Sequence, residues 1–346
     1  MKTYAFPGII EDDILDIASR QIPYMRTAWF SSLMKENERM LLDAIGCRKG
    51  RVMFFTSSGT AAMESVVQNY VAALGKAFII DGGTFGHRWV EICNYHGVEN
   101  ESMRIPFAED IDYNMLEERV RSYKPKVFLC QHHETSSGQL FDLKRISDIC
   151  RNTGTSLVTD VISSFLAEDL DMDQLGIDVA VTSSQKGLNL PPGASLVFLS
   201  EKALQVDFRH NNFYLDFQDN LKNLERGQTP FSPATTIFMQ IHERMRRNME
   251  KGIAGIIAET RAKALYFREL CARHDWEIPA SNPSNAVTGF FVHRNAGVLC
   301  DELQKRDIFI MPSGKPHFFR VSHMGSDSMA DLDELAAIIG EIENMP

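Results

Sequence analysis

The 346-residue sequence has no long hydrophobic run and no excess of positive charge. No apolar stretch approaches the roughly 18 residues that a membrane-spanning helix needs. The opening segment MKTYAFPGIIEDD also lacks the apolar core of a secretory signal. Acidic residues outnumber basic ones by 46 to 36, which gives a formal net charge of −10. This charge argues against nucleic acid or an anionic membrane as a partner, but it is compatible with a local basic pocket for a small anion.

The six cysteines are scattered and show no CxxC spacing. Cys130 and Cys150 lie in or beside apolar runs, where reduced core thiols are expected. His132 and His133 are adjacent, so on a strand their side chains would point to opposite faces. No cysteine or acidic partner completes a tetrahedral set with them, and we therefore predict no metal site. The sequence as a whole indicates a protein of the reducing cytoplasm.

Short apolar runs alternate with helical patterns along the first 200 residues. Helix-like segments such as 114–123 and 143–152 lie between several of these runs. Continuous apolar runs, as opposed to alternating ones, are typical of parallel strands that are covered on both faces. We therefore predict an α/β fold with a mainly parallel sheet between helices. The predicted strands are residues 51–56, 77–81, 126–131, 156–160, 178–182 and 195–200.

The pattern changes after the segment TPFSPATT. Residues 236–274 are helix-like and charged, which favours a solvated helix face over a coiled coil. Two short strand candidates, TGFFVH and FFRVSH, and a terminal helix follow. We predict a large domain over residues 15–240 and a smaller C-terminal α+β domain over residues 241–346, with residues 1–14 joining the smaller one.

Polar residues gather at the carboxyl ends of the predicted strands, where ligands of open parallel sheets bind. In TSSGTAAMES, a strand ends and a helix begins near Thr60, so backbone N–H groups together with Ser58 and Gly59 could hold a phosphate. An ordinary helix cap would use the same residue types. The sequence contains no Walker motif and no proper GxGxxG motif, so a nucleotide is not indicated.

Lys186 stands between an apolar run and a proline–glycine turn. A lysine used as a chemical reagent needs neighbours that hold it still and remove water from it, whereas a surface lysine does not. Asp160 ends the run SLVTD and could either cap the next turn or pair with a protonated ring nitrogen, as pyridoxal phosphate (PLP) requires. A phosphate cradle, an acid and a lysine together are more specific than any one of them.

These motifs resemble those of class V, fold-type I PLP-dependent aminotransferases, close to the alanine–glyoxylate and serine–pyruvate branch. They follow the family order from about residue 7 to residue 325, and SSQKGLNLPPG is the most specific of them. The N-terminal FPGII and the later FRVSH depart from the usual family patterns, which leaves the substrate open. The other resembling segments are SSGTAAMES, GGTFGHRW, HHETSSG, TDVISS, NFYLD with RGQTPFSPA, and FRVSHMG.

The resemblance implies a role for each matching residue. Lys186 would carry PLP as a Schiff base and act as general base and then acid. Asp160 would keep the ring nitrogen protonated, and Arg320 would bind the substrate carboxylate as a bidentate fork. The remaining implied cofactor contacts are Ser58, Gly59, Thr60 and Gln185 at the phosphate, Phe85, Thr135 and Ile162 around the ring, and Ser232 (or Thr229) from the neighbouring subunit of a homodimer.

The implied activity is transfer of an amino group from a small amino acid of the alanine or serine type to a 2-oxo acid such as glyoxylate or pyruvate. A 2-aminoethylphosphonate–pyruvate transaminase is an alternative, because its motifs overlap with these. A PLP lyase of the cysteine-desulfurase type typically has histidine before the lysine and a cysteine in a mobile loop, whereas Gln185 precedes Lys186 here. A non-catalytic relative would not need Asp160, Lys186 and Arg320 together.

Overall fold

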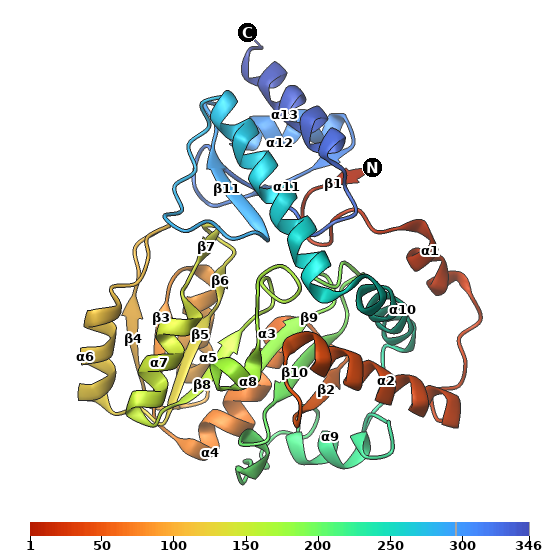
Figure 1. Cartoon of the computed structure of the whole chain (residues 1–346), viewed down its shortest axis with the longest axis vertical. Helices are drawn as coiled ribbons and strands as arrows, with labels where there is room; N and C mark the ends of the chain where they lie inside the picture. Colours follow the sequence, from red (N-terminus) through yellow and green to blue (C-terminus); the bar gives the residue numbers. More distant parts are fainter. Residues whose placement is uncertain (295, 346) are drawn as a thin grey trace.

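The computed structural model describes residues 1–294 and 296–345 and is built around a seven-stranded sheet (Figure 1). The strand order is β2-β10-β9-β8-β5-β3-β4. Among these described strands, β10 alone runs antiparallel to its neighbours, β2 and β9. The predicted, mainly parallel sheet is therefore confirmed. The strands are β2 (Arg51–Phe55), β3 (Ala77–Asp81), β4 (Asn100–Arg104), β5 (Val127–Gln131), β8 (Ser156–Asp160), β9 (Ile177–Ser183) and β10 (Ser195–Leu199).

Both faces of this sheet are covered by apolar packing. Successive residues of β5 alternate between two core clusters: Val127 and Leu129 belong to one, and Phe128 and Cys130 to the other. This two-sided burial explains why the strands are continuous apolar runs. Residues of α3 (Gly59–Val66), α5 (Thr84–Tyr95) and α9 (Phe217–Leu224) belong to the first cluster, and residues of α2 (Ala28–Ile45), α6 (Tyr113–Tyr123), α7 (Leu143–Thr153), α8 (Met172–Leu175) and α10 (Thr235–Lys251) to the second.

The helix that was predicted to begin near Thr60 does not continue as one regular α-helix. A π-helical stretch, η2 (Val67–Val71), separates α3 from α4 (Ala72–Leu74). The buried Asn69 lies in this stretch, and its amide donates to the backbone carbonyls of Ser65 and Leu215. The amide thereby ties the helix to the loop before α9, which the spacing of apolar residues did not indicate.

The C-terminal part carries a separate core around a three-stranded antiparallel sheet of order β11-β14-β13. At the N-terminus, β1 (Lys2–Thr3) pairs in parallel with β12 (Ile308–Phe309), so the two ends of the chain lie in the same part (Figure 1). The elements of this part are α11 (Ile253–Arg273), β11 (Val287–Phe291), α12 (Ala296–Lys305), β13 (Met311–Pro312), β14 (Phe318–Ser322) and α13 (Met329–Glu343). The boundary predicted at residues 240 and 241 falls inside α10 and stays a prediction.

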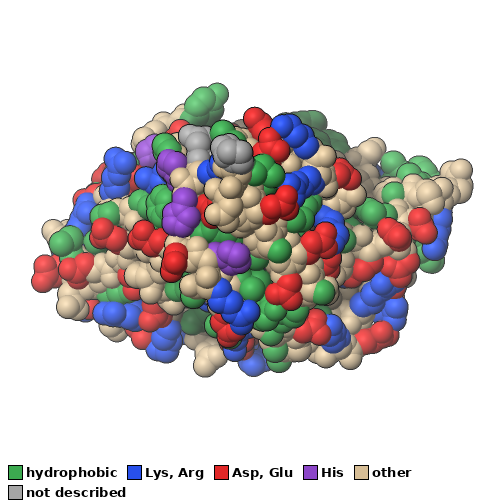
Figure 2. All heavy atoms as spheres, turned by 90° about the horizontal axis from the view of Figure 1, so that it is seen from above, with side chains coloured by type: hydrophobic (Ala, Val, Ile, Leu, Met, Phe, Trp, Pro, Cys, Tyr) green, Lys and Arg blue, Asp and Glu red, His purple; other side chains and the backbone are tan. Residues whose placement is uncertain are grey.

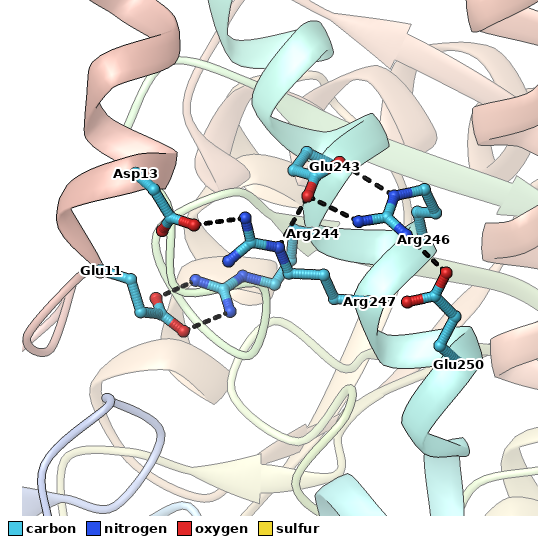
Figure 3. A network of polar contacts seen from close by, with 7 residues as sticks. All are labelled: Glu11, Asp13, Glu243, Arg244, Arg246, Arg247 and Glu250. Atoms are coloured by element: carbon cyan, nitrogen blue, oxygen red, sulfur yellow. Dashed lines mark hydrogen bonds and ion pairs between the residues drawn. The ribbon is translucent and has the colours of Figure 1, made fainter.

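The charged stretch 236–274 forms α10 and α11, which meet at Gly252, where φ is +86°. Part of its charge faces the N-terminal segment (Figure 3). The buried Arg244 binds both carboxylate oxygens of Glu11, just before α1 (Asp12–Leu15), and Arg247 binds Asp13. A short helix, η1 (Asp16–Ser19), follows α1. These ion pairs hold the N-terminal segment against α10 on its way to α2.

The surface seen from the end that carries α13 has basic and acidic side chains interspersed, with no continuous basic face in that view (Figure 2). Within residues 1–294 and 296–345, no helix is long and apolar enough to cross a membrane. In the same residues, no group of three or more His, Cys, Asp or Glu side chains is placed to hold a metal ion.

Candidate active site

The carboxyl ends of several strands carry the predicted site residues to one edge of the sheet. Asp160 is the last residue of β8, and Lys186 lies in the turn after β9. Asp160, Arg88 and Arg320 all act electrostatically on the Lys186 amine, and Phe85 lies with its ring centroid 6.0 Å from that amine. The structure therefore brings together residues that are up to 235 positions apart in the sequence (320 minus 85).

The turn around Lys186 is held by short polar contacts and by one glycine. Ser184 Oγ donates to the carbonyl of Pro191 at 2.7 Å, and Asn189 Nδ2 donates to the carbonyl of Ile9, also at 2.7 Å. A Cβ on Gly187 would collide with the backbone carbonyl of Phe165, so only glycine fits there. These contacts explain why the segment SSQKGLNLPPG has so specific a composition.

The Lys186 amine is largely removed from water. Its Nζ lies 3.5 Å from the ring centroid of Phe6, which comes from the N-terminal segment. Burial lowers the pKa of Lys186 to about 7; the carboxyl of Asp160 opposes this shift, and Arg320 and Arg88 add to it. An amine with this pKa is substantially neutral at neutral pH, which is the form that can act as a nucleophile or a base.

Asp160 is buried, with 6% of its surface exposed. Its Oδ1 accepts a hydrogen bond from the backbone N–H of Ile162 at 2.7 Å, so it does cap the following turn. Burial, assisted by Glu134, raises the pKa of this carboxyl to about 7, although the hydrogen bond from Ile162 and the charges of Lys186 and Arg88 oppose the shift. A protonated ring nitrogen placed against Asp160 would supply the positive partner that a buried carboxylate needs.

The predicted phosphate cradle lies at the start of α3. This helix begins at Gly59, and the side chain of its N-cap residue, Ser58, makes no capping hydrogen bond. Ser58 is therefore not used as an ordinary cap, and its hydroxyl can face a ligand. Thr60 Oγ1 accepts from Arg88 Nη1 at 3.1 Å. A Cβ on Gly59 would lie 2.6 Å from Ile162 Cδ1, so Ile162 packs directly against this turn.

Glu134 is a functional residue that the sequence reasoning missed. It is fully buried, and its carboxylate accepts from the backbone N–H groups of Gly86 (3.0 Å), Phe85 (3.4 Å) and Ser136 (3.1 Å). The charge satisfies the free N–H groups at the start of α5 and fixes the position of Phe85. The signal in the sequence was an acidic residue within HHETSSG, directly after a buried strand.

Arg320 extends from β14 to the edge of the large sheet. Its Nη1 donates to the carbonyl of Thr135 at 2.9 Å, and its Nη2 donates to the carbonyl of Pro312 at 2.9 Å. The hydroxyl of Thr135 lies 2.6 Å from that of Ser163. Burial lowers the pKa of the Arg320 guanidinium, which Glu134 opposes. Both Nη groups of Arg320 are therefore bound to neutral carbonyls. A negatively charged substrate carboxylate would form stronger hydrogen bonds with the guanidinium and could displace them.

Thr229 and Ser232 lie in the loop between α9 and α10. The hydroxyl of Thr229 donates to the carbonyl of Phe231 at 2.7 Å, and Ser232 is exposed. No described contact joins either residue to Lys186 or Asp160. Their predicted role in a neighbouring subunit therefore stays a prediction.

The residues at this edge fit PLP chemically. Several buried polar atoms have no hydrogen-bond partner among the described residues, as expected where a polar ligand belongs. Burial also lowers the pKa of His133 to about 3, so its ring is neutral. Gln185 directly precedes Lys186 and is partly exposed. The unpartnered atoms include Ser183 Oγ, Asn189 Oδ1 and both ring nitrogens of His133.

Comparison with known proteins identifies the family. A family model described as "Aminotransferase class-V" matches residues 23–211, more than half of the chain. Serine–glyoxylate aminotransferase of Hyphomicrobium methylovorum is 26% identical over 90% of this chain and 79% of its own length. 2-Aminoethylphosphonate–pyruvate transaminase of Pseudomonas aeruginosa is 27% identical over 82% of this chain and 80% of its own length.

A solved structure gives the same fold. The aspartate aminotransferase of subgroup IV from Thermus thermophilus superposes with a TM-score of 0.91 over 99% of this chain and 98% of its own, at 23% identity. The chain belongs to the class-V aminotransferases, a PLP-dependent family. The expected α/β fold and the expected enzyme class are confirmed.

Proposed function

We propose that this aminotransferase moves an amino group from a small amino acid of the alanine or serine type to a 2-oxo acid such as glyoxylate or pyruvate, with PLP bound covalently to Lys186. The observation that carries the proposal is the pair formed by Lys186 and Asp160. Burial brings the pKa values of both to about 7 at the edge of the sheet where ligands bind.

The side chains of the site have separate tasks in this proposal. PLP, when bound, supplies the electron sink for the reaction. The amine of Lys186 takes the proton from the substrate Cα and later returns one, for which a pKa near 7 is well matched. Asp160 holds the proton on the ring nitrogen, and Arg320 holds the substrate carboxylate. Phe6 and Phe85 limit the access of water to the amine.

2-Aminoethylphosphonate is the second candidate donor. The similarity to a 2-aminoethylphosphonate–pyruvate transaminase favours it, and the fork of Arg320 can bind a phosphonate as well as a carboxylate. A lyase of the cysteine-desulfurase type has less support. Five of the six cysteines are buried, and the sixth, Cys300, lies half-buried on α12, where burial raises its pKa.

The proposal is tested by a half-reaction screen of the holoenzyme. Alanine, serine, 2-aminoethylphosphonate and cysteine are added singly, and the loss of the cofactor's visible absorbance is followed. Borohydride reduction before substrate is added should fix the cofactor to the peptide that contains Lys186, and the Lys186→Ala variant should remain unlabelled. Labelling of another lysine would refute the site, and release of sulfide from cysteine without amino transfer would favour the lyase.

A further inference from the structure

A cavity of about 670 Å³ lies beside the site, between the large sheet and the C-terminal part. Its walls include residues 81–84 at the start of α5, residues 104–107 after β4, Ser136, and residues 313–315 after β13. Two contacts connect it with the site. Ser136 Oγ donates to Glu134, and the carbonyl before residue 313 accepts from Arg320.

The cavity collects positive charge in a chain whose net charge is −10. Arg88, Arg104 and Lys315 line it, and none of the three makes an ion pair with another residue of the described chain. Arg88 lies over the ring of Phe85 at 5.1 Å, and Lys315 lies over the ring of Phe107 at 4.2 Å. These aromatic contacts orient the cations without neutralising them.

Two carboxylates also line the cavity. Asp81 is engaged by His87, with 3.1 Å between Oδ2 and Nδ1. Glu91 is exposed and lies one helical turn after Arg88 on α5. Three basic side chains therefore face two acidic ones, and one of the acidic side chains already has a partner. The cavity keeps a surplus of positive charge.

We propose that this cavity binds a second anionic group of the substrate, namely a carboxylate, phosphate or phosphonate at the far end of an amino donor or oxo acid. The inference rests on the proposed transamination and adds a class of acidic substrates to the small neutral ones. Arg320 binds the group next to the reacting carbon, and Arg88, Arg104 and Lys315 bind the distal one. The methyl side chain of alanine and the hydroxymethyl side chain of serine are small, so these substrates would leave most of the 670 Å³ cavity filled with water.

The experiment compares matched donors in single-turnover half-reactions of the holoenzyme. L-aspartate is paired with L-alanine, and O-phospho-L-serine with L-serine, so that each pair isolates the distal anion and the two pairs separate carboxylate from phosphate. The test protein is the double variant Arg104→Gln/Lys315→Gln. Lys126→Gln is the control, because Lys126 is also exposed but precedes β5 at the opposite edge of the sheet.

We expect the ratio of kcat/KM for the anionic donor over its neutral partner to fall about tenfold in the double variant, for at least one pair, and to stay constant in the control. An unchanged ratio in both pairs would overturn the inference while leaving the transaminase intact. If none of the donors reacts, the proposed function fails, and the inference is then tested by measuring ligand binding to the cavity. By calorimetry, the wild type should bind succinate at least tenfold more tightly than butyrate, and the double variant should lose that preference; equal affinities would overturn the inference.

Discussion

Lys186 and Asp160 are two titratable groups whose pKa values burial moves to about 7 from opposite sides. Each carries a cost for the folded protein, because burial disfavours its charged form. The proposed reaction needs both groups, because it uses a neutral amine and a carboxylate at the same pH. Activity and stability should therefore respond in opposite directions when Asp160 is replaced.

Replacing Asp160 with asparagine should lower turnover and, at high pH, raise the stability of the folded protein. Turnover of the holoenzyme should fall by about 100-fold or more, because the amide cannot hold a proton on the ring nitrogen. The folded pKa of Asp160, about 7, lies above the ordinary aspartate pKa of 3.8, so the folded state binds more protons than the unfolded state between these pH values. This contribution to stability is present at low pH and is lost as the pH rises towards 7.

The Asn variant does not ionise and avoids that loss. Urea unfolding of the cofactor-free proteins should show the variant to be more stable than the wild type by about 1–2 kcal/mol at pH 8, with a smaller difference at pH 5. The expected gain is modest because the hydrogen bond from the backbone N–H of Ile162 stabilises the ionised carboxylate and offsets part of the burial cost in the wild type. Near-normal turnover of the variant would mean that Asp160 serves only as the cap of its turn.

At the scale of elements, the start of α3 and the turn after β8 fit together through two residues. The helix begins at Gly59, and Ile162 packs where a side chain at Gly59 would lie. The glycine therefore lets the helix N-terminus approach the site and leaves Ile162 in the position where we propose that it covers the cofactor ring. Gly59 is the first residue of α3, where the contact with Ile162 and not helix propensity decides which residue fits.

Gly59→Ala should leave the protein folded but weaken PLP binding by about tenfold, because the new methyl group pushes Ile162 towards the cofactor. A matched double variant tests the cause. Ile162→Val removes Cδ1, the atom 2.6 Å from the added Cβ, so Gly59→Ala/Ile162→Val should recover most of the affinity. Titration of the apoproteins with PLP measures each Kd. Additive losses in the double variant would disprove the steric explanation.

At the scale of the whole molecule, an exposed aromatic patch lies beside the loop that carries Thr229 and Ser232. Phe213 is 83% exposed and Tyr214 is 44% exposed, and Tyr214 stacks on Phe231 with ring centroids 5.2 Å apart. Apolar surface of this kind commonly marks an interface between proteins. We propose that a second copy of this chain covers it, which would carry Ser232 towards the neighbour's phosphate cradle.

The prediction is a homodimer with composite sites. The Lys186→Ala variant and a Ser232→Asp variant, whose added charge would repel the cofactor phosphate, should each be inactive alone. Mixing equal amounts under exchange conditions should restore about one quarter of the wild-type activity, because half of the dimers are hybrids and each hybrid contains one intact site. Sedimentation should show a dimer at micromolar concentration. A fully active monomer, or no recovery on mixing, would exclude shared sites.

The sequence by itself determined six of the seven strands and most of the site edge; the edge strand β4 (Asn100–Arg104) is mostly polar and only partly buried, so no apolar run marked it. Buried parallel strands have to be apolar on both faces, so their positions are visible as local runs, and the residues that follow them lie at one edge by geometry alone. Lys186, Asp160 and the turn at Gly59 could therefore be located from short segments. Their chemical roles were implied by the resemblance of these segments to class V aminotransferases.

Only the tertiary structure decided the contacts that cross from one part of the fold to another. Phe6 reaches Lys186 from 180 positions away, and Arg320 reaches Thr135 from 185. Glu134 holds α5 through backbone N–H groups, which have no side-chain signature in a sequence. The pKa values near 7 likewise depend on burial, which is a property of packing. Periodicity encodes which face of an element is buried, but the partner it meets there is fixed only when the chain folds.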